Sequence, residues 1–171
     1  DAWSAIGTAV LMRGKQRADV KLDGAGDRKA LRFKALNVVM PEGRLDATGY
    51  LAFNPALKWD VTAKLASFDP GYFLPAWHGA IRGDLKTQGG RNARGGMDIA
   101  LDATHLGGQL RDRALTGRGN VALTLPATAK DVWTASGDVD LRLGHSNVIA
   151  RGRIAQNIDV DAKFSPFNLN D

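Results

Sequence analysis

Residues 137–143 read Gly-Asp-Val-Asp-Leu-Arg-Leu, so that small or apolar side chains alternate with charged ones along the whole segment. A period of two is typical of a β-strand with one face in water and one face packed. The same alternation recurs in residues 81–87, 97–102, 119–125 and 158–164. These segments therefore predict an antiparallel sheet with one polar and one apolar face.

The first half of the chain shows the same pattern. Leu31, Phe33 and Ala35 alternate with basic residues, residues 45–53 hold small or apolar side chains at odd positions, and residues 59–65 alternate again. Turn-forming residues separate the predicted strands. These predicted turns are residues 23–27, 41–43, 54–55, 89–96 and 107–108. A meander of about ten strands is expected.

Residues 67–75, Ser-Phe-Asp-Pro-Gly-Tyr-Phe-Leu-Pro, depart from the alternation. Ser67 or Asp69 is suited to cap a helical turn that has Pro70 at its first position. One short helix is therefore predicted near 69–75, and the sheet is expected to be subdivided at this point.

Composition excludes several classes of protein. A hydrophobic content of 44% over 171 residues rules out wholesale disorder, and the absence of cysteine rules out disulfides, thiol nucleophiles and cysteine-bound metals. The net charge of +5 comes from interleaved acidic and basic residues, which is typical of a solvated surface. Because the chain starts at Asp1 and carries no signal segment or long apolar run, we expect residues 1–171 to be one β-sheet segment of a larger protein.

No motif in the sequence indicates catalysis or a cofactor. His78, His105 and His145 lack the spacing of a metal site and are expected at the surface or in turns. Ser146 lies outside any nucleophile-elbow motif, and the glycine-rich residues 89–96 lack the lysine of a phosphate-binding loop. The four tryptophans are expected in core or rim packing. The protein is therefore predicted not to be an enzyme and to need no cofactor.

The predicted apolar face must be covered. It presents roughly twenty aliphatic and aromatic side chains, each worth about 2 kcal/mol when removed from water. With one short helix available, the sheet must cover itself as a sandwich, as a closed barrel or as a trough bent lengthwise. The trough would offer an apolar groove on the order of 50 Å long, which suits acyl chains.

Two segments resemble a known family. Residues 68–85, Phe-Asp-Pro-Gly-Tyr-Phe-Leu-Pro-Ala-Trp-His-Gly-Ala-Ile-Arg-Gly-Asp-Leu, are similar to a recurring element of the TamB family of Gram-negative bacteria. Residues 106–119, which contain Leu-Arg-Asp-Arg-Ala-Leu-Thr-Gly-Arg-Gly, resemble that family's unit of a small-residue turn followed by a strand. The resemblance extends over most of the chain.

This resemblance implies a long curved antiparallel sheet, folded lengthwise into a taco-like trough with an apolar interior. It further implies a periplasmic segment of an inner-membrane-anchored protein, with the anchor outside these residues. The implied role is to carry phospholipid between the inner and outer membranes. The implied partners are an Omp85-type, TamA-like outer-membrane barrel, with nascent outer-membrane proteins as further clients, and no nucleic acid.

The family has no catalytic motif, so the candidate site residues come from the apolar alternation. The side chains expected to line the groove are Ile81, Leu85, Ile99, Leu101, Val121, Leu123, Leu125, Val139, Leu141, Val160 and Phe164. The alternative is a closed barrel or sandwich that binds nucleic acid or polysaccharide through arginine-rich strands. No aromatic residues interleave with those arginines, which disfavours a single-stranded nucleic-acid site.

Overall fold

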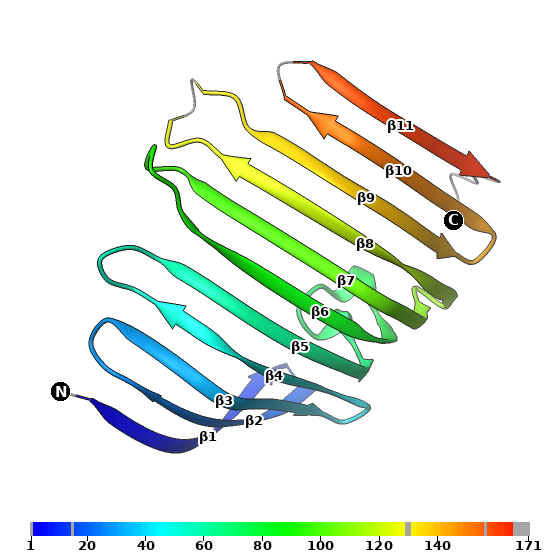
Figure 1. Cartoon of the computed structure of the whole chain (residues 1–171). Coiled ribbons are helices and arrows are strands. Elements are labelled where there is room, and N and C mark those ends of the chain that lie inside the picture. The colour runs from blue at the N-terminus through cyan, green and yellow to red at the C-terminus, as the bar shows by residue number, and fades with distance from the viewer. Residues whose placement is uncertain (1, 15, 129–130, 156, 166–171) are drawn as a thin grey trace.

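The computed structural model describes residues 2–14, 16–128, 131–155 and 157–165, and these residues form one sheet of eleven strands (Figure 1). In chain order the strands are β1 (Trp3–Arg13), β2 (Gln16–Gly26), β3 (Ala30–Met40), β4 (Gly43–Ala52), β5 (Lys58–Phe68), β6 (Gly79–Arg91), β7 (Met97–Leu110), β8 (Arg113–Leu125), β9 (Thr134–Leu143), β10 (Ser146–Ile154) and β11 (Ile158–Ser165).

Each strand pairs antiparallel with the next, so the sheet order follows the chain from β1 to β11. The predicted all-β antiparallel sheet is confirmed, with eleven described strands where about ten were expected. The alternative of a closed barrel or sandwich is wrong, because the sheet is single and open, with β1 and β11 at its two edges.

The pairing register gathers the apolar residues on one face. A row of directly paired residues runs from Trp59 through Gly89, Ile99 and Leu123 to Ala135, crossing five strands. Paired residues in an antiparallel sheet project to the same side, and so do residues two apart on one strand. We call this side the apolar face and the opposite side the charged face.

Three β-bulges keep the apolar face continuous. In β3, β5 and β7 two residues face one residue of the next strand, at 34–35, 66–67 and 104–105. Ser67 and His105 adopt left-handed backbone conformations there, with φ of 49° and 52°. Because each bulge inserts one residue, the alternation resumes in phase and returns Phe68 and Leu106 to the apolar face.

The single helical turn predicted near 69–75 is present, but it is a 3₁₀ turn and not an α-helix. Residues 69–78, which we call the strap, contain two 3₁₀ turns, η1 (Pro70–Tyr72) and η2 (Pro75–Trp77). Asp69 caps η1 as expected. The second proline prevents an α-helix, because it lacks an N–H and holds the preceding Leu74 in an extended conformation.

The strap folds back over the apolar face at the N-terminal end of the sheet. Tyr72 is only 5% exposed and packs against Ala18 and Met40, and its hydroxyl donates to the carbonyl oxygen of Leu11 at 3.0 Å. The strap and the bent ends of β1 and β2 lie behind the sheet in Figure 1. Because β1 is four strands away from β5, this contact requires the sheet to curl toward its apolar face.

The sheet itself continues past the strap, since β5 and β6 pair directly. The expected subdivision near 69–75 therefore stays a prediction. Among the described residues, no helix has the length and apolarity needed to cross a bilayer.

The predicted turn at 107–108 is wrong, and the turns predicted at 23–27 and 89–96 begin later than expected, because these glycines lie inside strands. Gly24 and Gly26 belong to β2, and residues 107–108 belong to β7. Gly89 lies in β6 beneath the ring of Trp59, where a β-carbon would collide with Trp59 Cζ2. Glycine inside a strand often marks such a close approach, and here it makes room for a large neighbour on the apolar face.

Candidate functional site

The structure brings all eleven predicted lining residues onto the apolar face. Val121 pairs with Leu101, Leu123 pairs with Ile99, and the row through Val121 continues across β9 and β10 to Val160. The remaining members lie on parallel rows of the same register: Ile81, Leu85, Leu125, Val139, Leu141 and Phe164.

These side chains remain partly open to solvent. Leu101, Leu125, Val160 and Phe164 are between 40% and 56% exposed, and the other seven lining residues are half-buried. No side chain in the described part of the chain is less than 2% exposed, with the exception of the small Ala18. The face is thus an open apolar surface and not the interior of a closed core.

A hollow in this surface lies between β8 and β11. It has a volume of about 160 Å³, and Val121, Val139, Ile154 and Val160 contribute to its lining. Gly137 and Gly152 pair across β9 and β10 at its floor, where the missing side chains leave space. The hollow is therefore suited to a flexible apolar group.

The predicted set of lining residues omits part of the face. Trp59, Val61, Leu106, Leu115 and Val148 occupy apolar-face positions as well. Leu106 follows a bulge, which shifts it out of the simple alternation with Leu101. The sequence signal for Leu106 is Leu-Gly-Gly directly after His105, a residue of the charged face. This signal can be interpreted only once the bulge at 104–105 is known.

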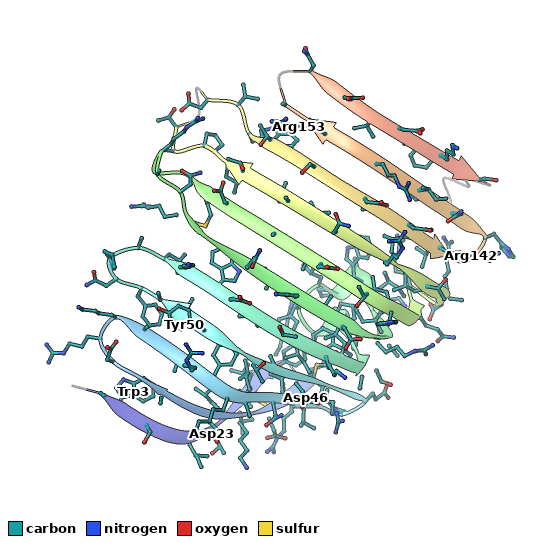
Figure 2. All side chains as sticks on the ribbon, viewed as in Figure 1. Trp3, Asp23, Asp46, Tyr50, Arg142 and Arg153 are labelled. Atoms are coloured by element: carbon teal, nitrogen blue, oxygen red, sulfur yellow. The ribbon has the colours of Figure 1, made fainter. Side chains whose placement is uncertain are left out.

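The opposite face is charged and wet. Arg151 Nε lies 3.0 Å from Asp138 Oδ2, and Asp84 pairs with Lys64 at 3.8 Å and with His105 at 3.1 Å. The labelled Asp23, Asp46, Tyr50, Arg142 and Arg153 of Figure 2 belong to this face. Exposed pairs of this kind contribute little to stability. Their position nevertheless identifies the side of the sheet that faces water.

Charge is distributed very unevenly between the two faces. Every carboxylate on a described strand lies on the charged face, whereas the charged residues at apolar-face positions are Arg13, Arg91 and Arg113. Each of these arginines is the first or last residue of its strand. The middle of the apolar face is consequently free of charge along the described strands.

The histidines lie at the surface, as predicted. His78 Nε2 is 3.1 Å from Asp112 Oδ2, His105 pairs with Asp84, and His145 is exposed. Within the described ranges, no group of three histidine or carboxylate side chains is arranged to hold a metal ion.

A comparison with protein-family models identifies the family. The model described as "TamB, N-terminal domain" matches residues 5–171, nearly the whole chain. The chain belongs to the TamB N-terminal domain family. No curated protein and no solved structure gives a significant match. TamB proteins are transport and assembly proteins of the cell envelope and not enzymes, and the family implies TamA as a partner.

Proposed function

We propose that the apolar face of this TamB domain carries the acyl chains of phospholipids between the inner and outer membranes, within the periplasmic part of an inner-membrane-anchored protein. Head groups stay in water beyond the edges of the sheet. The domain also supports outer-membrane protein assembly with a TamA-like barrel of the Omp85 type. Nascent outer-membrane proteins are the further clients of that assembly.

The observation that carries this proposal is the continuous, partly exposed apolar register from β5 to β11. Exposed apolar patches beyond a few hundred Å² mark binding surfaces in soluble proteins. Covering this face with hydrocarbon would gain about 25 cal/mol for each Å² removed from water. A ligand with long apolar chains can cover the apolar face across all of these strands, whereas a compact ligand covers only a part of it.

Lipid retention tests the proposal. We expect phospholipid to co-purify with the chain from a Gram-negative host, as measured by native mass spectrometry with lipid extraction. The double variant Leu123→Asp, Leu141→Asp places two carboxylates on the apolar face and should lose the lipid, because a dry, unpaired charge costs several kcal/mol. Circular dichroism establishes that the variant remains folded.

The matched control is Thr116→Asp, Ala122→Asp, which adds the same charge at exposed positions of the charged face. It should keep its lipid. A folded lining variant that retains lipid contradicts the lining assignment. If no lipid accompanies any of the three proteins, the transport function loses its support, and the salt dependence of oligonucleotide and glycan binding then tests the alternative of a polar binding module.

A further inference from the structure

The apolar face carries charge only at its edges, and that charge has one sign. Arg13, Arg91 and Arg113 are the charged residues at its described positions, and no described strand contributes a carboxylate there. Positive charges at the edges contribute nothing to the binding of a pure hydrocarbon. The arrangement fits an apolar ligand that ends in an anionic group.

The three arginines differ in what their side chains contact. Arg13 Nη1 donates to the carbonyl oxygen of Tyr72 at 2.8 Å and also to that of Phe73, so its guanidinium holds the strap. The Arg113 residue also has an interaction partner, so it is not available in the same way as Arg91. Arg91 is exposed, and within the described residues its guanidinium has no hydrogen-bond or carboxylate partner.

The position of Arg91 is fixed by backbone pairing. It is the last residue of β6, it pairs with Met97 of β7, and its own N–H donates to the carbonyl oxygen of Leu57 at 2.9 Å. Two residues earlier on the same face, Gly89 lies under the ring of Trp59. The indole N–H of Trp59 donates to Thr87 Oγ1 at 3.1 Å, which holds the ring in place.

Arg91 therefore stands at the edge of an apolar surface, beside a fixed indole ring. Tryptophan favours the boundary between hydrocarbon and water, because its ring is apolar and its N–H is polar. Arginine binds phosphate oxygens with two parallel hydrogen bonds, and these charge-assisted bonds are roughly twice as strong as neutral ones. Arg91 therefore provides the contact that a lipid phosphate requires, and the ring of Trp59, whose N–H is bonded to Thr87, provides an apolar surface for the adjoining part of the chain.

We propose that Arg91 binds the phosphate of a phospholipid whose acyl chains lie on the apolar face along Ile99, Leu101 and Leu123. This deepens and rests on the proposed lipid function, because it assigns the head group to one edge of the sheet. That edge is formed by the β4–β5, β6–β7 and β8–β9 connections (Figure 1). Arg91 thereby selects phosphate-bearing lipids over amphiphiles of equal chain length that lack a phosphate.

Two probes with the same twelve-carbon chain separate the head group from the tail. Dodecylphosphocholine carries a phosphate and dodecyl maltoside does not, and both are titrated below their micelle concentrations by isothermal titration calorimetry with the 171-residue chain. We expect the phosphate-bearing probe to bind roughly tenfold more tightly or better, as a charge-assisted hydrogen-bond pair allows.

The variant Arg91→Gln should abolish this preference while leaving the maltoside affinity unchanged. Arg91→Lys should keep a part of the preference, because it retains the charge but loses the paired geometry. The matched control is Arg94→Gln, which removes the same charge from an exposed position in the adjoining turn. It should behave as the parent protein does.

Each outcome decides the assignment. A preference that survives Arg91→Gln overturns the role of Arg91 and leaves the proposed function standing, since the maltoside still binds. If neither probe binds, the proposed function and this inference fail together. Inorganic phosphate alone should not displace dodecylphosphocholine; full displacement would show a simple anion site and overturn the lipid assignment.

Discussion

The two ends of the sheet use the same apolar register differently. From β2 to β5 the strap and the curled strands cover part of the face, and the large side chains Phe33, Met40, Leu65 and Tyr72 are buried, whereas β1 is exposed along its length. Among the described residues from β6 to β11, Leu115 is the large apolar side chain that is buried. One end is packed on itself, and the other is open.

This difference separates stability from binding. A buried aromatic side chain contributes several kcal/mol, whereas a half-exposed leucine contributes much less until a ligand covers it. We therefore infer that the N-terminal end anchors the fold and that the C-terminal strands hold the ligand. Substitutions at the two ends should then have different consequences, and the predictions below test that division.

The largest expected effect is at Tyr72. Tyr72→Ala removes the ring from between Ala18 and Met40 and deletes the hydrogen bond to Leu11, so it should lower the free energy of unfolding by about 3–5 kcal/mol. Urea denaturation followed by circular dichroism measures it. Leu74→Ala is the control on the same strap: its side chain is exposed, and the loss should stay below about 1 kcal/mol. Equal losses in the two variants would contradict an anchoring role for Tyr72.

A smaller effect is expected at Gly89, near the junction of the two ends. Gly89→Ala drives a methyl group into Trp59 and the carbonyl oxygen of Asp98, and such overpacking should cost about 1–3 kcal/mol. The midpoint of urea unfolding reports this change. Gly7→Ala in β1 is the matched control, because a methyl group there meets no atom within 4 Å, and it should be neutral or slightly stabilising. A neutral Gly89→Ala would mean that Trp59 does not need the space above Gly89.

Gly89 also shows why the sequence predicted the sheet better than its details. The period of two identified β6, β7, β8, β9 and β11, but not β10, and placed all eleven predicted lining residues on one face, since register follows directly from alternation. Both Gly89 and Gly108 predict turns, because the sequence reveals neither the ring that crosses Gly89 nor the backbone that approaches Gly108. Gly108 has a φ of 112°, which a residue with a side chain rarely adopts.

Other features depended on contacts far apart in the chain. The first strand was not predicted, because Ile6, Val10 and Met12 are apolar on its charged face and the alternation disappears there. The strap's course over the apolar face depends on a hydrogen bond between Tyr72 and Leu11, 61 residues apart. Arg91, whose guanidinium has no partner among the described residues, likewise became recognisable only after the register assigned each charge to a face.

At the base of the strap, Asp69 should have a moderate effect. Its Oδ1 accepts hydrogen bonds from the N–H groups of Gly71 at 2.8 Å and Gly79 at 2.9 Å. Asp69→Ala leaves both donors without this acceptor and should cost about 1–2 kcal/mol by the same denaturation assay. Asp69→Asn keeps an acceptor oxygen and should recover most of that loss. If the two variants are equally destabilised, the carboxylate contributes through something other than these bonds.

The smallest effect is expected at the β2–β3 turn, far from the strap. Asp27 Oδ1 accepts from the N–H groups of Lys29 at 2.7 Å and Ala30 at 2.9 Å, and these backbone hydrogen bonds lower the pKa of Asp27. A lowered folded-state pKa means that the charged carboxylate adds stability above the ordinary aspartate pKa of about 3.9, and that this stability is lost as the pH falls through the lowered value.

Asp27→Asn should therefore be slightly less stable than the parent chain at neutral pH, and the gap should close on acidification below pH 3. Unfolding midpoints measured from pH 6 to pH 2.5 follow the gap. Because the turn is fully exposed, water screens the interaction and keeps the difference small. A gap that widens toward low pH would have the wrong sign for a carboxylate stabilised in its charged form. Such a result would mean that folding raises the pKa of Asp27, opposite to the direction that these two hydrogen bonds give.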